Sequence, residues 1–276
     1  MSRSLSEVLE IVLRTDTGRV REHNEDAVFA NPHLGLVVLA DGMGGYNAGE
    51  VASSMAATRV AAELETSLAA RGPHVPDGAA GEAFAGHCLR DAIADANAAI
   101  FQAAQDDARY AGMGTTLVAT LFFDDRLVVA HVGDSRLYRF RDGTLAQLTH
   151  DHSLLQEQID SGLLSVEEAR HSLNRNLVTR ALGVDPLVEV ELAEHPVQPG
   201  DLYLLCSDGL NDMVPDEEIA LVLQALSGNL ELAAQQLVEM ANDNGGRDNV
   251  SLILIRVRQA YPALGTWWQA FKARFA

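Results

Sequence analysis

The sequence predicts an α+β fold in which antiparallel β-sheets carry helices on their outer faces. Predicted strands follow one another in groups and do not alternate one for one with helices, which disfavours a parallel Rossmann-like sheet. The long helical segments are also grouped, and the chain has no G-x-G-x-x-G dinucleotide motif. We find no internal repeat or low-complexity linker, so we expect one domain that ends near Arg258.

The first part of the chain is predicted to contain strands at 10–14, 26–30 and 35–39. These segments are short, apolar or β-branched, and are broken by Gly, Asn and Pro. From residue 48 the sequence is Ala-rich with apolar residues at helical spacing, which predicts a helix over 48–71. A loop with two Pro and three Gly follows, and a second long helix is predicted at 82–107.

A strand meander and a polar excursion are predicted next. Asp124-Asp125 and Asp142-Gly143 are the expected hairpin turns between strands at 116–123, 126–132, 136–141 and 145–148. Residues 149–183 are polar and predict a short-helical surface excursion. The remaining predicted elements are two strands, two helices and a closing strand, at 187–192, 201–206, 215–226, 230–243 and 250–258.

Composition narrows the classes of function. The 276 residues carry a formal net charge of -19, which repels a nucleic-acid backbone and suits a protein that collects divalent cations. The single lysine, Lys272, excludes a Walker A motif, a Schiff-base Lys and a kinase strand Lys, so phosphate handling falls to Arg or metal. The isolated Cys88 and Cys206, the lack of an apolar signal core and the short apolar runs predict a cytoplasmic protein without a membrane span.

Acidic residues meet Gly or Asn at the ends of several predicted strands. The pattern occurs at Asn24-Glu25-Asp26, Asp41-Gly42, Gly133-Asp134, Ser207-Asp208 and Asp248-Asn249. Carboxylates at such positions repel one another unless a divalent cation neutralises them, and oxygen ligands favour Mg²⁺ or Mn²⁺ over Zn²⁺. Asp-Gly alone often marks a hairpin turn, as we interpret Asp142-Gly143, but the segments after Asp41 and Asp208 are helical.

A competing metal hypothesis concerns His150-Asp151-His152, which has the H-x-H spacing of a zinc pair. No third His or H-E-x-x-H partner is evident, so a structural role is favoured. His23, beside Arg21 and Glu25, is interpreted first as a local hydrogen-bonding residue.

The motifs, in this order, resemble the metal-dependent serine/threonine protein phosphatases of type 2C, the PPM family, in their bacterial form. The matching motifs are TDTGRVREHNED (15–26), ADGMGG (40–45), GTT (114–116), HVGDSR (131–136), LTHDHS (148–153), TRALG (179–183), CSDGL (206–210) and GRDNVS (246–251). The resemblance covers about residues 9–258. It implies a four-layer α-β-β-α sandwich of two antiparallel sheets flanked by helices, with a phosphatase domain at 1–258 and a short amphipathic tail at 259–276.

The resemblance also implies a chemistry. Phosphoserine and phosphothreonine in proteins would be hydrolysed by a metal-bridged hydroxide that attacks phosphorus directly, with two Mn²⁺ or Mg²⁺ ions and a third, weaker ion seen in bacterial relatives. Two metal ions would be bound by Asp41, the Gly42 carbonyl, Asp208 and Asp248, and a third by Asp134 with Asp208. Glu25, Asp26 and Asn249 would support the residues around the metals. Arg21 would bind the substrate phosphate. Cys206 lacks the Cys-x5-Arg loop of Cys-based phosphatases, so it is not expected to be a nucleophile.

The donor of the leaving-group proton stays open. Eukaryotic relatives carry His directly after the Asp-Gly, where this chain has Met43, and some bacterial relatives have His after the Gly-Gly, where it has Tyr46. A Ser or Thr alkoxide needs protonation, and Tyr46, His23 or a metal-bound water would serve.

Two segments outside these motifs carry further expectations. The flap at 151–180 contains three Arg that either contact substrate residues near the phosphosite or belong to a solvated surface: Arg170, Arg175 and Arg180. In the tail at 262–276, five apolar residues fall on one helix face, which predicts a closing helix or a peripheral or partner contact: Leu264, Trp267, Trp268, Phe271 and Phe275.

The expected partners are phosphorylated proteins, including the substrates of a bacterial Ser/Thr kinase, and not nucleic acid. The alternative is a non-catalytic regulator of the same fold that binds phosphoproteins. The intact Arg21, Asp41, Asp208 and Asp248 argue against it. A different two-metal hydrolase such as a nuclease would need a basic track, which this acidic chain lacks.

Overall fold

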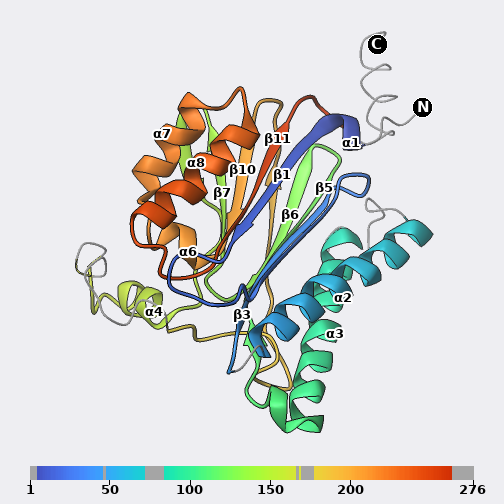
Figure 1. Ribbon diagram of the computed structural model, residues 1–276. Coiled ribbons are helices and arrows are strands. Elements are labelled where there is room, and N and C mark those ends of the chain that lie inside the picture. Colours follow the sequence, from blue (N-terminus) through green and yellow to red (C-terminus); the bar gives the residue numbers. More distant parts are fainter. Residues whose placement is uncertain (1–4, 46–47, 72–83, 166–167, 169–176, 263–276) are drawn as a thin grey trace.

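Two antiparallel β-sheets packed face to face form the centre of the protein, and helices cover both outer faces (Figure 1). The computed structural model describes residues 5–45, 48–71, 84–165, 168 and 177–262. One sheet has the strand order β1-β11-β10-β7-β8, and the other has the order β2-β3-β5-β6-β9. The four-layer α-β-β-α sandwich expected from the resemblance is therefore confirmed.

The first sheet joins segments from the two ends of the chain. β1 (Leu9–Asp16) pairs along its whole length with β11 (Val250–Val257), which pairs on its other side with β10. The rest of this sheet is β10 (Leu202–Cys206), β7 (Arg136–Arg141) and β8 (Thr144–Gln147). Because β11 lies between β1 and β10, the sheet is complete only when the C-terminal strand is in place.

The second sheet is built from hairpin-connected neighbours. Its strands are β2 (Asp26–Asn31), β3 (Leu36–Met43), β5 (Leu117–Phe123), β6 (Arg126–Val132) and β9 (Glu191–Pro196), and the two-residue β4 (Gly114–Thr115) also pairs with β3. The predicted turns are confirmed, since Asp124, Asp125 and Asp142 have φ angles of 48°, 56° and 51° and Gly143 has 78°. Positive φ at both central residues is the geometry of a tight two-residue hairpin.

The helices divide between the two outer faces. The long α2 (Ala48–Arg71) and α3 (Phe84–Asp106) share a hydrophobic core with the second sheet. α7 (Asp216–Ala225) and α8 (Leu230–Asp243) share one with the first sheet. Four short helices complete the described part of the chain: α1 (Leu5–Val8), η1 (Ala108–Tyr110), α4 (Leu154–Asp160) and α6 (Asp208–Asn211).

Strand alternation explains how the sandwich positions its polar residues. In β3, Leu36, Val38 and Ala40 pack against the helices, whereas Val37 and Leu39 lie in the core between the sheets. Successive side chains of a strand point to opposite faces. Asp41, two residues after Leu39, therefore continues the face that points between the sheets.

The predicted strand at 187–192 was misplaced, because β9 begins only at Glu191. Its register on β6 runs from His131↔Glu191 to Arg126↔Pro196. Leu187 is 87% exposed, so its apolar character does not mark a buried strand. The actual strand, ELAEHP, is more polar because its outer face is partly open to solvent.

None of the described helices is both long and apolar enough to cross a membrane. The tail residues 263–276, including the apolar helix face predicted there, lie outside the described residues. Near the end of the described chain, the Tyr261 hydroxyl donates to the Arg126 carbonyl at 3.0 Å.

Candidate active site at one end of the sandwich

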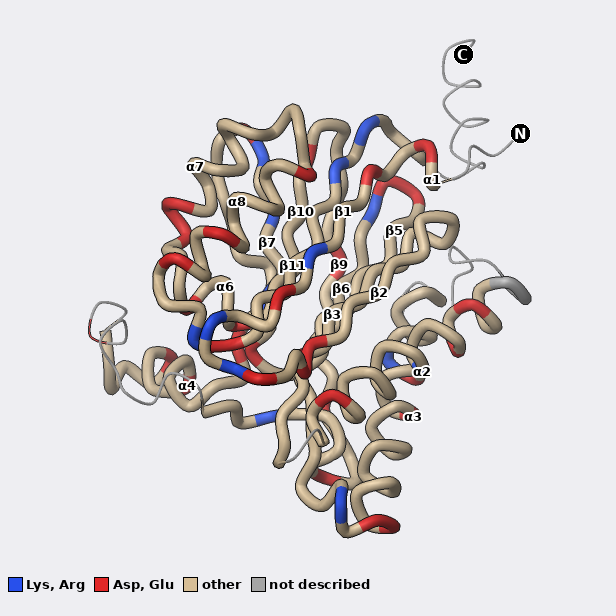
Figure 2. Tube along the Cα trace, in the orientation of Figure 1, with Lys and Arg blue, Asp and Glu red and all other residues tan. Residues whose placement is uncertain are grey.

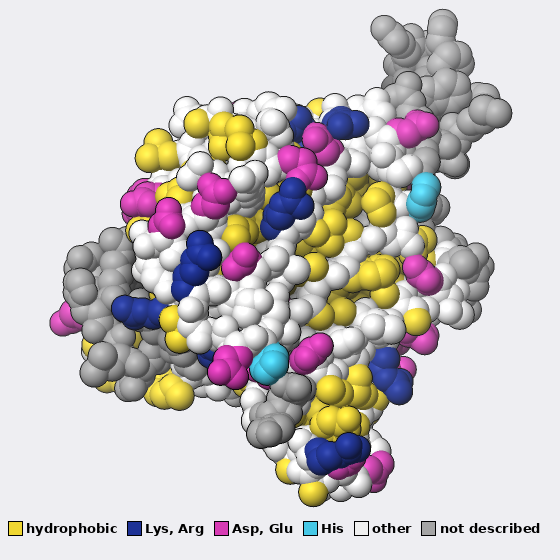
Figure 3. Space-filling view, in the orientation of Figure 1, with side chains coloured by type: hydrophobic (Ala, Val, Ile, Leu, Met, Phe, Trp, Pro, Cys, Tyr) yellow, Lys and Arg dark blue, Asp and Glu magenta, His cyan; other side chains and the backbone are white. Residues whose placement is uncertain are grey.

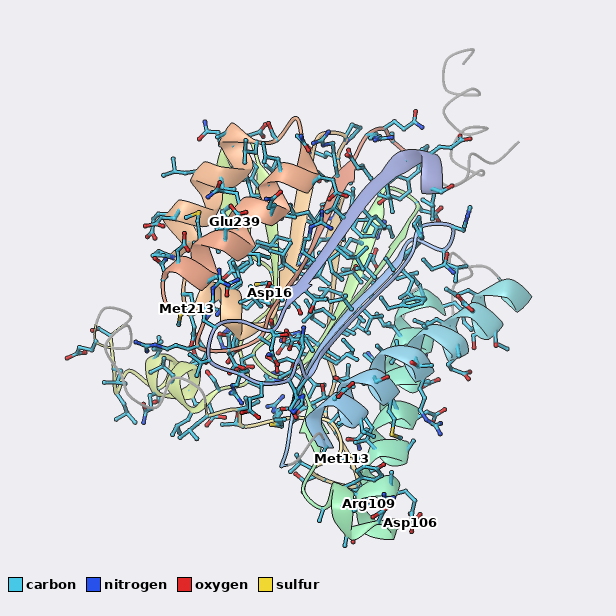
Figure 4. The ribbon with its side chains drawn as sticks, in the orientation of Figure 1. Asp16, Asp106, Arg109, Met113, Met213 and Glu239 are labelled. Atoms are coloured by element: carbon cyan, nitrogen blue, oxygen red, sulfur yellow. The ribbon has the colours of Figure 1, made fainter. Side chains whose placement is uncertain are left out.

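The predicted carboxylates meet at one cavity of about 190 Å³ at the end of the two sheets. Asp41, Asp134, Asp208 and Asp248 all line it, together with other predicted site residues, namely Arg21, Glu25 and Gly42. Acidic segments from distant parts of the sequence converge at this end of the strands (Figure 2). Figure 4 shows side-chain oxygen atoms gathered below Asp16, the last residue of β1.

Asp41 and Asp26 face each other across the β2–β3 pair. The Asp41 backbone is fixed by the 114–116 motif, because Thr116 N and Thr115 Oγ1 both donate to the Asp41 carbonyl, at 2.9 and 2.8 Å. Asp41 N donates to Thr116 Oγ1 at 3.2 Å, and the Thr116 hydroxyl also pairs with Ser135 Oγ at 2.7 Å. Thr116 thus ties the strand of Asp41 to the loop of Asp134.

Ser207 links the two sheets at the site. Its Oγ donates to Asp26 Oδ2 at 2.9 Å and accepts from Ser251 N at 3.0 Å. Gly209 lies so close to β11 that a Cβ there would be 2.0 Å from the Asn249 carbonyl oxygen. Asp208 is therefore held against the segment that carries Asp248.

Asn249 anchors the loop that carries Arg21. Its Oδ1 accepts from Glu25 N at 2.8 Å, and its Nδ2 donates to the carbonyls of Thr17 and His23, each at 2.9 Å. A buried side chain with both ends bonded in this way fixes the 17–25 loop relative to β11. Arg21 then extends over the cavity, and its Nη2 donates to Asp248 Oδ2 at 2.6 Å.

The acidic cluster is electrostatically unfavourable without a cation. Burial raises the pKa of Asp41 well above its ordinary value, and repulsion from Asp26, Asp208, Asp134 and Asp248 adds to the shift. Burial followed by repulsion from Asp134 raises the pKa of Asp208 in the same way. Burial raises the pKa of Asp134 to about 7 and that of Asp26 to about 6. Positive charge in the cavity would return these groups to the carboxylate form.

Two further observations fit a bound cation. Asp26 Oδ1 is buried and has no hydrogen-bond partner among the described residues. A Cβ on Gly42 would lie 2.1 Å from the Gly49 carbonyl oxygen and 2.5 Å from that of Glu25, so only glycine fits there. The carboxylates with the close-packed Gly42 backbone give an all-oxygen donor set, which suits Mn²⁺ or Mg²⁺.

The predicted H-x-H pair does not form. His150 Nε2 pairs with Asp160 Oδ2 at 2.7 Å, whereas the His152 ring stacks on His131 with 4.8 Å between centroids. His131, His152 and Glu191 offer ligand atoms within 4.8 Å of one another, a trio that no other His, Cys, Asp or Glu in the described chain matches. The site carboxylates are spaced more widely around their cavity.

A hydrogen bond argues against a metal at this histidine trio. Gly133 N donates to His152 Nδ1 at 3.1 Å, so the single ring proton stays on Nε2, which faces Glu191 Oε2 at 3.3 Å. Burial lowers the pKa of His152, which keeps the ring neutral. With both ring nitrogens engaged, the ring has no lone pair for a metal. We conclude that it positions Gly133 and, through it, Asp134.

The remaining predicted residues are either outside the described part of the chain or away from the cavity. Tyr46, Arg170 and Arg175 lie outside the described residues. His23 is exposed and does not line the cavity, and Arg180 pairs with Glu189 at 3.2 Å. Cys206 is fully buried, and burial raises the pKa of its thiol, as expected for a residue that is not a nucleophile.

Sequence reasoning missed four residues at the site. Thr116 and Ser207 stood inside the quoted motifs but were given no role. Asp212 lies one helical turn after Asp208, and its charge contributes to the raised pKa of Asp208 and Asp134. Arg247 directly precedes Asp248 and lines a neighbouring cavity. For Ser207, Asp212 and Arg247 the available signal was a position beside or four residues from a predicted ligand, whereas for Thr116 it was only membership of the GTT motif.

Comparison with known proteins identifies the family of the chain. A family model described as "Protein phosphatase 2C" matches residues 17–245. Over 246 residues the chain is 40% identical to the serine/threonine phosphatase stp of Listeria welshimeri, covering 88% of this chain and 93% of that protein.

Solved structures give the same result. The structure of the Mycobacterium tuberculosis serine/threonine phosphatase PstP/Ppp has a TM-score of 0.79 at 39% identity, covering 91% of this chain and 100% of that one. A structure of the catalytic domain of PstP in complex with 2 manganese ions has a TM-score of 0.78 at 39% identity, covering 91% and 99%.

Proposed function

The chain belongs to the protein phosphatase 2C family and is a metal-dependent serine/threonine protein phosphatase, and we propose that the cavity around Asp41 is its active site. The observation that carries the proposal is the group of buried carboxyls with raised pKa values around a cavity that Arg21 also lines. Such a group is strongly unfavourable as a purely structural feature, whereas it suits cation binding.

Four carboxylates and one carbonyl are proposed to hold the cations. Asp41, the Gly42 carbonyl, Asp208 and Asp248 would bind two Mn²⁺ or Mg²⁺ ions, and Asp134 with Asp208 would bind a third. When bound, divalent cations lower the pKa of water and offset the charge of a phosphoryl group. Glu25, Asp26 and Asn249 would keep the ligand segments in place through the hydrogen bonds of Asn249 and Ser207.

Arg21 is proposed to bind the substrate phosphate. Its side chain is 51% exposed, and among the described residues only Asp248 accepts a hydrogen bond from it, at Nη2. The remaining guanidinium donors are free to form a bidentate contact with phosphate oxygens, a geometry that Lys cannot provide. Anchoring of the 17–25 loop by Asn249 limits the entropy lost when Arg21 binds.

We extend the proposal to organisation and partners. Residues 1–258 would form the phosphatase domain and 259–276 a separate short tail. The substrates would be proteins phosphorylated by a bacterial Ser/Thr kinase that this enzyme opposes. A cytoplasmic location is proposed from the two buried free thiols, Cys88 and Cys206, which suit a reducing compartment.

The proposal is tested by phosphate release from a phosphothreonine peptide, with Mn²⁺, without added metal and with EDTA. We expect release only with metal, and loss of release in Asp208→Asn but not in Asp95→Asn, which removes the same charge from the exposed surface of α3. Phosphate release that does not depend on added metal, or no release with any metal, would refute the assignment of the site.

A further inference from the structure

A second cavity, of about 170 Å³, adjoins the proposed metal site. The two cavities share Arg21, Asp208 and Asp248 in their walls, so a ligand that fills one reaches the other. The second cavity adds Met213, labelled in Figure 4 beside the end of α8, and Arg247. With two Arg among its lining residues, the second cavity differs in charge from the more acidic metal site next to it.

Arg247 extends from a fixed backbone. The Gly246 carbonyl accepts hydrogen bonds from Arg19 N at 2.7 Å and Val20 N at 3.2 Å, so the segment before Arg247 is held against the loop of Arg21. Gly246 itself has a φ of 49° and lies close to the Arg19 side chain, which favours glycine at this contact. The two Arg therefore approach one cavity from two segments that are joined by backbone hydrogen bonds.

The Arg247 side chain has no ion-pair or hydrogen-bond partner within the described part of the chain. It is exposed, and its guanidinium group is a cation with several hydrogen-bond donors. In a chain with a net charge of -19, a cation near several carboxylates is normally paired. Figure 3 shows basic side chains on this face, near the ends of α7 and α8.

The acids around this cavity do not neutralise Arg247. Under the proposed function, on which this step rests, Asp208 and Asp248 are occupied by cations. Asp212 is half-buried and has interactions of its own. With cations in place, the wall that faces a substrate is therefore positive on both sides, at Arg21 and at Arg247.

We propose that Arg247 forms a subsite for a second anionic group on the substrate, next to the phosphate that Arg21 binds. The ligand is a carboxylate or a second phosphate on a residue within about three positions of the phosphorylated one, since an extended chain rises about 3.3 Å per residue. Arg forks bind both kinds of group in bidentate fashion. The enzyme then prefers phosphosites in acidic or multiply phosphorylated segments.

The test compares three phosphothreonine peptides: one with neutral neighbours, one with Glu neighbours and one with a second phosphoserine. Activity (kcat/KM) is measured for the wild type, for Arg247→Gln and for Arg247→Lys. The control is Arg19→Gln, which removes the same charge from the adjoining loop but does not line the cavity. Affinity for non-hydrolysable phosphonate versions of the peptides, measured by fluorescence anisotropy, gives a readout independent of turnover.

We expect wild type to favour both anionic peptides over the neutral one, and Arg247→Gln to reduce that preference about tenfold, as for a lost charge-assisted hydrogen bond. Arg247→Lys should retain part of it, and Arg19→Gln should match wild type. A larger loss for the doubly phosphorylated peptide would identify phosphate as the preferred group.

An equal preference in wild type and Arg247→Gln overturns the subsite. If wild type hydrolyses none of the peptides, the proposed function fails instead, and the phosphonate affinities then decide on the subsite alone. If Arg247→Gln then binds the anionic phosphonate peptides as tightly as wild type does, the subsite is overturned as well. Thermal melting of each variant confirms that the comparison is between folded proteins.

Discussion

The Arg21 guanidinium donates to the Asp248 carboxylate at 2.6 Å, so the proposed phosphate-binding group contacts a proposed metal ligand. The contact joins residues 227 positions apart, and Asn249 fixes both segments at the same point. Substrate binding and metal binding are therefore adjacent but involve different atoms, and substitutions should separate them.

Replacing Arg21 with Ala should raise the KM for a phosphothreonine peptide about tenfold or more, because a bidentate charged contact is lost. Mn²⁺ affinity, measured by calorimetry, should change much less, since Asp248 keeps its metal-facing oxygen atoms. Arg19→Ala is the matched control, from the same loop but outside both cavities. An unchanged KM in Arg21→Ala would contradict the assigned role.

Asp41→Asn should abolish activity and yet stabilise the metal-free protein. Burial and four neighbouring carboxylates raise the pKa of Asp41, so an uncharged isostere relieves repulsion. Each kcal/mol relieved raises Tm by about 2–4 °C in a chain of this size. Thermal melts in EDTA check the effect, with the exposed Asp95→Asn as control. A lower metal-free Tm than wild type would mean that the cluster is not repulsive.

The metal-free enzyme should lose stability as pH rises. The pKa values of Asp26 and Asp134 are about 6 and about 7 in the folded protein, against an ordinary 3.8. Between these limits the folded state binds more protons than the unfolded one, so unfolding becomes easier as protons leave. The stability that these two carboxyls contribute is therefore fully present below about pH 4 and is lost as pH rises through about 7.

Thermal melts between pH 5 and 8, with and without Mn²⁺, measure this dependence. Because the cation binds the deprotonated carboxylates, the rise in Tm on adding Mn²⁺ should grow with pH over the same interval. If the increase in Tm on adding Mn²⁺ were the same at every pH, these carboxyls would already be ionised in the metal-free protein.

Gly42→Ala should destabilise the protein by about 1–3 kcal/mol and lower metal affinity. The added Cβ would lie 2.1 Å from the Gly49 carbonyl oxygen, and backbone atoms on both sides cannot move aside as a flexible side chain would. Gly45→Ala is the control, because a Cβ there meets nothing within 4 Å. Chemical denaturation of both variants measures the difference, and equal stabilities would rule out the close contact.

Where strand ends mark the residues, the sequence predicted which carboxyls line one cavity, and their role as metal ligands stays a prediction. Asp41 lies near the end of β3, and Asp134 and Asp208 come just after β6 and β10. The antiparallel order of these strands and β11 brings the three residues together at one end of the sheets. The local pattern of apolar run, acid and glycine was sufficient, because burial of the strand fixes where its end lies.

Contacts between segments distant in sequence could not be predicted in the same way. The pairing of His131 with Glu191 depends on the β6–β9 register, and the misplaced start of β9 concealed it. Arg247 looked like a neighbour of Asp248, and its separate cavity depends on how Gly246 meets the loop of Arg21. These relationships arise from tertiary packing, which no local pattern encodes.

The position of β11 has a consequence for synthesis of the enzyme. Asp41 is synthesised well before Asp248 and the strand that lies between β1 and β10. A fragment that stops before Asp248 lacks both this strand and a proposed metal ligand. We therefore expect dephosphorylation to begin only after β11 has been synthesised, so that incomplete chains do not remove phosphate from proteins in the cell.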